Sequence, residues 1–255
     1  MTPDYRPVSR RWLAMLLLMA ALAEILLIIA LRPHGGANIV QLELAPSAAA
    51  FVATVQRDWT QAGAPAGGDP WCGLGLPHTA QATAHASLGK LRCNLALDSL
   101  ALVPGYVGLL MIFTLGLLPQ GGQVLLSAAW CAPACAAGLA DLLENGLTLR
   151  ALALLGQPDL TDALVAGVRH ASQAKWVLLA LALAALGHLA WHARMPDRLL
   201  RRIAAALSAA AALALPLGAW WWQSAIGLGM AAMVLALALL AWASVAAGRG
   251  LPVAS

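Results

Sequence analysis

Three polar side chains lie on one face of a predicted helix in an otherwise apolar part of the chain. Asp141, Glu144 and Asn145 are spaced at i, i+3 and i+4, which places them side by side on a helix surface. Ionisable groups inside a membrane span are costly, and they are therefore candidates for function. Such oxygen ligands could hold a divalent cation, or the carboxylates could relay a proton. Pairing with basic residues that only locks helices together is an equally open alternative.

Two further polar residues, Asp98 and Lys175, are predicted to lie in the same layer. Asp98 opens one apolar segment, with Tyr106 about two turns further in, and Lys175 opens another segment. Because successive spans run in opposite directions, Asp98 and Lys175 meet the outer half of the segment that carries Asp141. The predicted ligand- or ion-binding residues are Asp98, Tyr106, Asp141, Glu144, Asn145 and Lys175.

The composition indicates that lipid is the main solvent of this chain. Of its 255 residues, 61% are hydrophobic and only 10% are charged, and the mean hydropathy is +0.78. A soluble domain carries about 25% charged residues. The net charge of +4 comes from basic residues at the ends of apolar segments rather than from one patch. This distribution is typical of membrane topology and argues against nucleic-acid binding.

Six apolar segments are long enough to cross a bilayer as helices. The predicted fold is therefore all-α, a polytopic transmembrane helix bundle that forms a single membrane domain. The first segment is interpreted as a retained helix, because its apolar core is longer than that of a secretory signal. The predicted spans are residues 12–31, 97–118, 124–149, 176–191, 203–222 and 225–247.

The distribution of arginines predicts the orientation. The run from Arg194 to Arg202 follows the fourth span, and Arg6, Arg10 and Arg11 precede the first. Cytoplasmic loops carry the excess of Lys and Arg. We therefore expect a bacterial inner-membrane protein with both termini in the cytoplasm. Residues 33–96 are then a periplasmic loop, and the polar layer faces outward.

Two short helices are predicted outside the spans. Residues 47–61 have apolar positions at helical spacing, and Ser47 is suited to cap the first turn. This amphipathic helix is expected to lie on the outer membrane surface or to cap the bundle. Residues 157–174 are predicted to form a second short surface helix before the fourth span.

The four cysteines fall into two pairs with different expected roles. Cys72 and Cys93 both lie in the periplasmic loop, where two nearby cysteines usually form a structural disulfide. Their spacing matches neither a C-x-x-C redox motif nor a zinc pattern. Cys131 and Cys135 lie inside the third span and are expected to pack as small apolar residues, with a metal or redox role left open.

Several stretches together resemble an uncharacterised group of small bacterial polytopic inner-membrane proteins. They are residues 43–51, Asp58-Trp59, Leu97-Asp98 with Tyr106, residues 140–145 and Lys175-Trp176. The Asp-x-x-Glu-Asn helix at 141–145 is the most specific of these. The resemblance covers about residues 40–190 and implies a fold and a polar cluster, but no activity.

The sequence favours a binding role over catalysis, since no phosphate-binding loop, nucleophile elbow or H-E-x-x-H motif is found. The first hypothesis is an outer-facing acidic pocket that binds a cation or a small polar or lipid ligand for transport or sensing. The alternatives are a membrane enzyme acting on lipid-like substrates and a non-catalytic accessory subunit of a membrane complex. The bilayer is the expected partner in every case, and a homo-oligomer is also open.

Overall fold

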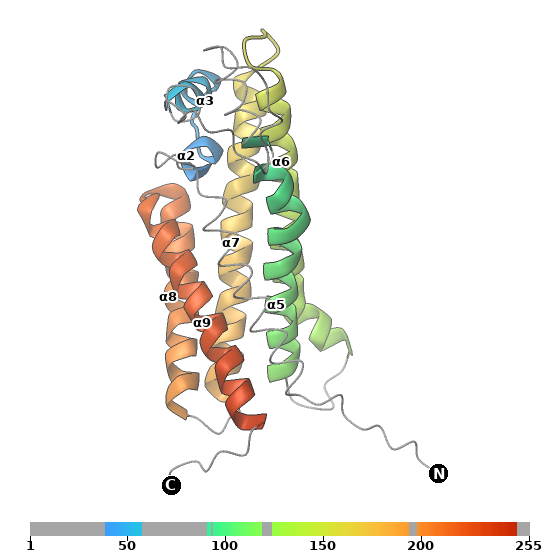
Figure 1. Cartoon of the computed structure of the whole chain (residues 1–255), viewed down its shortest axis with the longest axis vertical. Helices are drawn as coiled ribbons and strands as arrows, with labels where there is room; N and C mark the ends of the chain where they lie inside the picture. Colours follow the sequence, from blue (N-terminus) through green and yellow to red (C-terminus); the bar gives the residue numbers. More distant parts are fainter. Residues whose placement is uncertain (1–38, 58–90, 93, 119–123, 194–197, 249–255) are drawn as a thin grey trace, which may run out of the picture. The chain divides into compact units, whose positions relative to one another are not determined.

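The computed structural model describes residues 39–57, 91–92, 94–118, 124–193 and 198–248. Within these ranges the regular structure is helical (Figure 1). Five helices are long and apolar enough to cross a membrane, at Asn94–Leu117, Leu125–Ala153, Asp162–His192, Arg198–Trp220 and Ser224–Ala243. The all-α prediction is thus confirmed for the described residues and fits an integral, multi-pass membrane protein. The predicted first span, residues 12–31, lies outside the described ranges.

The bounds of these helices follow the predicted spans with differences at their ends. The first starts with α-helical residues 94–97, passes through a π-helical segment, Asp98–Leu102, and continues as α5. The helices after it are α6, α7, α8 and α9. Their bounds are Val103–Leu117 for α5, Val124–Ala153 for α6, Asp162–His192 for α7, Arg198–Trp220 for α8 and Ser224–Gly248 for α9.

Helix α7 is longer than predicted, and the second surface helix does not exist as a separate element. One continuous helix runs from Asp162 to His192 instead of starting at 176. Its start is set by Thr161, whose Oγ1 accepts a hydrogen bond from the Leu164 N–H at 3.3 Å. No proline interrupts the helix after that point. Lys175 consequently lies in the interior of a helix and not at its beginning.

The connection between α6 and α7 is a tight turn with one conformational requirement. The Leu154 N–H still donates to the Arg150 carbonyl at 3.2 Å, which continues the last turn of α6. Gly156 then adopts a φ of 78°, a left-handed conformation that glycine adopts without steric cost. The chain enters α7 a few residues later, at Asp162.

The chain divides into two compact units, one of which contains α8 and α9. Among the described residues, this unit comprises 105–118, 124–137, 176–193 and 198–248. Helices α8 and α9 lie side by side (Figure 1). They approach closely, since a Cβ added to Gly218 would lie 2.5 Å from Ile226 Cγ1. Small residues at such contacts are typical of helix packing in membranes.

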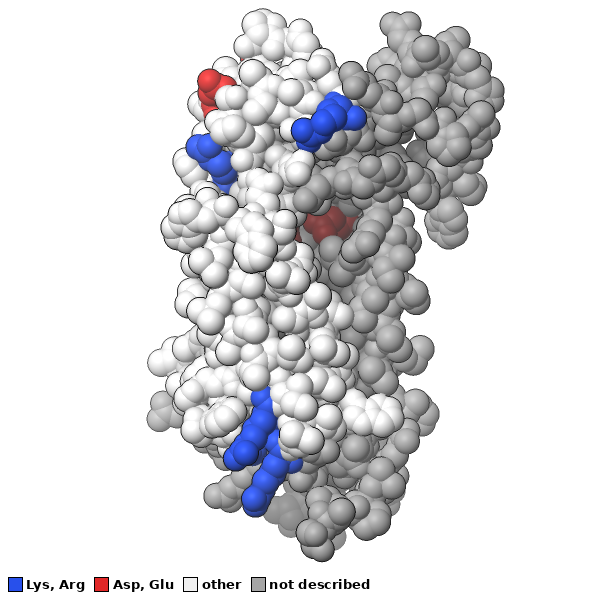
Figure 2. All heavy atoms as spheres, turned by 90° about the vertical axis from the view of Figure 1, so that its left-hand side faces the viewer, with Lys and Arg blue, Asp and Glu red and all other residues white. Residues whose placement is uncertain are grey.

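Large apolar side chains remain exposed on the long helices. Leu213 of α8, Leu228 of α9 and Leu181 of α7 are each more than half exposed. In the space-filling view of one face, uncharged residues make up most of the described surface (Figure 2). Apolar patches of this kind are unfavourable in water. A transmembrane helix presents such an apolar surface to the hydrocarbon core of the bilayer.

Among the described residues, the second compact unit comprises 39–57, 91–92, 94–104 and 138–175. It contains two short helices, α2 at Ile39–Glu43 and α3 at Ala48–Val55, beside parts of α6 and α7. Its core is a continuous set of buried apolar side chains from all four helices and from the segment before the π-helical turn. The largest of these are Leu42, Phe51, Val55, Leu91, Leu95, Leu152 and Val165.

The predicted helix after Ser47 is confirmed for Ala48–Val55, and the rest of its predicted range to residue 61 lies mostly outside the described residues. Ser47 Oγ accepts from the Ala50 N–H at 3.2 Å, as expected of an N-cap. The first turn of α3 also has an acceptor from a distant part of the chain. Asp162 Oδ1 accepts a hydrogen bond from the Ala48 N–H at 2.7 Å. These contacts fix the start of α3 against the start of α7.

Candidate functional site

The ammonium group of Lys175 lies among three carboxylates contributed by two other helices. Its Nζ is 2.6 Å from Glu144 Oε2, 3.2 Å from Asp141 Oδ1 and 3.5 Å from Glu43 Oε2. Lys175 is on α7, Asp141 and Glu144 are on α6, and Glu43 is the last residue of α2. We call these four residues the Lys175 cluster. All four belong to the second compact unit.

The Lys175 cluster is buried and unbalanced in formal charge. Glu144 has no exposed surface, and the other three residues are each 5% exposed. Desolvating an ion pair is expensive, and the attraction between its members offsets that cost only with good geometry. Three carboxylates surround a single ammonium here. The cluster therefore holds more acid than its own base can neutralise.

Helical register explains how α6 delivers its polar groups. Asp141, Glu144 and Asn145 are followed on the same face by Thr148, and all four are buried. Leu142 and Leu143 between them are 42% and 58% exposed. The face predicted from the i, i+3, i+4 spacing is therefore the interior face of the helix. This buried polar face also includes Thr148, which was not among the residues predicted from the sequence.

Asn145 joins α6 to the π-helical segment. Its Nδ2 donates to Asp98 Oδ2 at 2.6 Å and to Ser99 Oγ at 3.1 Å, and the Ser99 hydroxyl donates to the Leu95 carbonyl at 2.8 Å. A π-helical turn shifts the register of the residues that follow it, and such turns are frequent at functional sites. In this protein the π-helical turn begins at Asp98, the residue that accepts the hydrogen bond from Asn145.

Glu43 and Ser172 were missed in the sequence reasoning about the site. Ser172 is fully buried and its hydroxyl donates to Glu43 Oε2 at 3.3 Å. It precedes Lys175 by three positions on α7, so both side chains lie on one face. That spacing was a usable signal for Ser172. Glu43 had none of its own, because only the tertiary fold brings α2 to α7.

Three buried oxygen atoms on α6 make no hydrogen bond in the described part of the chain, namely Glu144 Oε1, Glu144 Oε2 and Thr148 Oγ1. Glu144 Oε2 is within ion-pair distance of Lys175 Nζ, at 2.6 Å. Glu144 Oε1 and Thr148 Oγ1 lie one helical turn apart on fully buried side chains, and they do not hydrogen-bond to each other in this structure. Nearly all buried polar groups in proteins are hydrogen-bonded, so each exception needs an explanation. Burial of this kind costs about 1–3 kcal/mol for an unsatisfied group.

The remaining predicted site residues are placed as follows. Tyr106 is buried on α5 and belongs to the other compact unit, so its assignment to the site stays a prediction. Cys72 and Cys93, the predicted disulfide, lie outside the described residues. Cys131 and Cys135 are free thiols, and Cys135 Sγ lies 3.5 Å from Met111 Sδ. This contact is the packing expected for small apolar residues.

A metal centre built from the usual ligands is not found in the part of the chain that the structure describes. No three His, Cys, Asp or Glu side chains are arranged there to hold a metal ion. Asp141 and Glu144, for which the sequence left cation binding open as one alternative, face the Lys175 ammonium. His188 stacks on the Trp130 ring at 5.9 Å between centroids, and this is a packing contact.

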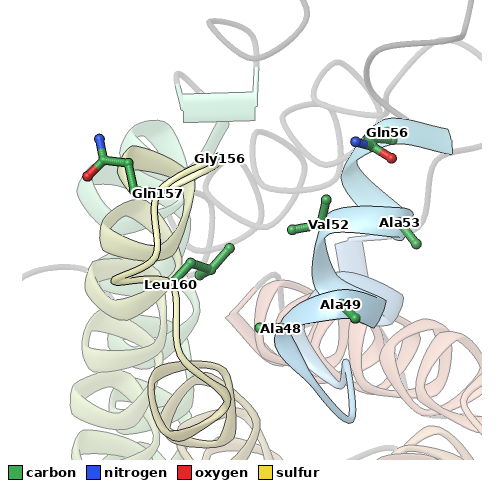
Figure 3. Close-up of a pocket in the computed structure, with 8 residues that line it drawn as sticks. All are labelled: Ala48, Ala49, Val52, Ala53, Gln56, Gly156, Gln157 and Leu160. Atoms are coloured by element: carbon green, nitrogen blue, oxygen red, sulfur yellow. The ribbon is translucent and has the colours of Figure 1, made fainter.

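A shallow groove of about 420 Å³ lies elsewhere in the same unit (Figure 3). Its walls are α3 and the turn between α6 and α7, and most of the lining side chains are small and apolar. It includes no member of the Lys175 cluster. The lining residues are Ala48, Ala49, Val52, Ala53, Gln56, Gly156, Gln157 and Leu160.

Comparison with known proteins gives no relative for this chain. No family model matches the sequence, and neither the curated proteins nor the solved structures include a match. The geometry of the site is therefore the basis for functional inference.

Proposed function

We propose that this membrane protein binds and releases a proton at the Lys175 cluster, and that it uses this step for transport or sensing across the bilayer. The observation that carries the proposal is the position of three buried carboxylates around one ammonium. Ionisable groups within transmembrane helices mark ion pathways and proton relays. An excess of acid in such a site is relieved when a proton or cation binds.

A proton suits this site better than a metal ion. A divalent cation takes six or more oxygen ligands, and Lys175 Nζ already occupies the space between the carboxylates. A proton needs no coordination sphere and no cavity. Its arrival removes one negative charge and lets Lys175 redistribute between the remaining carboxylates. That redistribution would couple proton binding to the packing of α2, α6 and α7.

The same proposal includes the orientation and the compartment. The arginine distribution supports an N-terminus and a C-terminus in the cytoplasm of a bacterium, with the Lys175 cluster in the outer half of an inner membrane. A proton would then enter from the outer side. The site residues proposed to respond are Asp98 and Asn145 as well as the cluster itself, because Asn145 adjoins Glu144 on α6.

Electrometry on a solid-supported membrane tests the proposal. Proteoliposomes carrying the full chain are exposed to a rapid acid jump, and the transient current from proton binding is recorded. We expect a current that is absent from protein-free liposomes and is reduced at least tenfold in Asp141→Asn. Asp159→Asn, in the exposed turn after α6, is the matched control and should behave as the wild type.

The rival role for the Lys175 cluster is purely structural, with ion pairs that only hold helices together. In that case the wild-type protein gives no current above that of empty liposomes. Asp141→Asn then lowers stability without any electrical consequence. A wild-type current that survives unchanged in Asp141→Asn would also contradict the assignment of this site.

A further inference from the structure

Glu144 differs from the other two carboxylates of the Lys175 cluster. Asp141 Oδ1 accepts a hydrogen bond from Lys175 at 3.2 Å, and Glu43 Oε2 accepts one from Ser172. Neither oxygen of Glu144 makes a hydrogen bond among the described residues, although Oε2 lies 2.6 Å from Lys175 Nζ as an ion pair. Glu144 is also the only one of the three carboxylates in the cluster with no exposed surface. A negative charge is least stabilised at this position.

Thr148 provides a second, independent observation at the same place. Its hydroxyl is fully buried and has no partner in the described part of the chain. It follows Glu144 by four positions on α6, so the two side chains are neighbours on one face. An ionised carboxylate only accepts hydrogen bonds, whereas a hydroxyl both donates and accepts. A threonine in a helix also has two accessible χ1 rotamers.

We propose that Glu144 is the proton-binding carboxylate of the Lys175 cluster and that Thr148 is its positioning residue. A hydronium ion transfers its proton to Glu144 Oε1, an O–H bond forms there, and a water molecule is released. The new carboxylic acid donates to Thr148 Oγ1. When the proton leaves, the Thr148 hydroxyl turns and donates to the carboxylate. The structure shows neither of these hydrogen bonds, so the Thr148 side chain must rotate about χ1 to bring its hydroxyl to Glu144 Oε1.

Lys175 keeps its place through this cycle. Glu144 Oε2 accepts from the ammonium as a carboxylate oxygen before protonation and as a carbonyl oxygen after it. The ammonium then interacts more strongly with Asp141 and Glu43, which retain their charges. The proton-binding atom and the ion-pairing atom are therefore the two different oxygens of one side chain.

Infrared difference spectroscopy between high and low pH tests this inference, which rests on the proposed proton-binding function. The wild-type protein in lipid should gain one carbonyl band of a protonated carboxylic acid on acidification. Glu144→Gln should lose that band entirely. Thr148→Val should retain it at a higher wavenumber, because the hydrogen bond to the carboxyl group is lost. Thr148→Ser restores the hydroxyl and should return the band to the wild-type position.

Thr114→Val is the matched control, since Thr114 is a buried threonine on α5 in the other compact unit. Its spectrum should equal that of the wild type. If Glu144→Gln does not fold, the Thr148 series still decides the outcome, because it leaves every carboxylate in place. A band at the wild-type position in Thr148→Val overturns the role of Thr148.

Two failures are distinguishable in this experiment. A carboxylic-acid band that persists in Glu144→Gln and disappears in Asp141→Asn means that the protein binds a proton, but at a different carboxylate. The proposed function then stands and this inference fails. The absence of any such band in the wild-type protein, together with no current after an acid jump, means that the proposed function itself is wrong.

Discussion

Replacement of Lys175 by methionine is the most direct perturbation of the buried site. Methionine keeps an apolar stem of similar length but removes the ammonium, so the packing of α7 is largely preserved. Three carboxylates with 5%, 5% and 0% exposure then remain without their common counter-charge. Removal of one partner from a buried ion pair costs about 3–5 kcal/mol. We therefore expect Lys175→Met to lower the free energy of unfolding by about 3–5 kcal/mol.

Reversible unfolding in mixed micelles, followed by far-ultraviolet circular dichroism, measures this change. Leu181→Met is the matched control, because Leu181 is on the same helix and is 52% exposed. A substitution at such a site usually changes stability by at most about 0.5 kcal/mol. The difference between the two variants isolates the loss of the ammonium from the introduction of a methionine.

A double variant tests whether the loss is electrostatic. Adding Glu144→Gln to Lys175→Met removes the carboxylate nearest to the missing ammonium, at 2.6 Å in the native protein. The double variant should be less destabilised than the sum of the two single variants, with a coupling of about 0.5–3 kcal/mol. A loss below about 1 kcal/mol in Lys175→Met, or strictly additive effects, would refute the electrostatic reasoning.

Two further predictions concern the contacts that hold each unit together. Gly218→Ala should cost about 1–3 kcal/mol in the same assay, because its Cβ would lie 2.6 Å from the backbone nitrogen of Ile226. Gly227→Ala has no atom within 4 Å and should be neutral or slightly stabilising. Asp162→Ala removes the acceptor of the Ala48 N–H and should destabilise α3 by about 1 kcal/mol. Amide hydrogen exchange should then become faster in α3 while α8 and α9 stay unchanged.

The sequence was sufficient for the long helices because each is encoded by local information. Long apolar stretches with few charged residues predict the spans, and the structure has long apolar helices for the five predicted spans that lie in described residues. The exception was the start of α7. Residues 157–174 were predicted to form a separate surface helix, yet no proline lies between 162 and 175 and the helix is continuous there. The residues there are more polar than in the rest of α7, but the backbone stays helical.

The candidate site was predictable in part for the same reason. Helical spacing placed Asp141, Glu144 and Asn145 on one face, and topology brought Lys175 to their layer. The partner of each group was not predictable. Glu43 reaches Lys175 only because α2 packs within a core made from distant segments. Such a contact depends on tertiary structure, and one sequence carries no local signal for it.

The length of α7 has a consequence for access to the Lys175 cluster. Its 31 residues extend about 46 Å, whereas a hydrocarbon core is about 30 Å thick. Trp191 is half exposed near the end of α7, with the Arg202 guanidinium 5.6 Å from its ring centre, and such aromatic and basic residues are typical of membrane boundaries. Lys175 is sixteen residues, or about 24 Å, from Trp191 along the helix. With Trp191 at one boundary and α7 parallel to the bilayer normal, the opposite boundary is only about 6 Å from Lys175. Under the proposed function, a proton from that side crosses little more than one layer of side chains, whereas a proton from the other side needs a path along most of α7. The two aqueous phases would then exchange protons with the site at unequal rates, and the slower exchange would limit proton leakage across the bilayer.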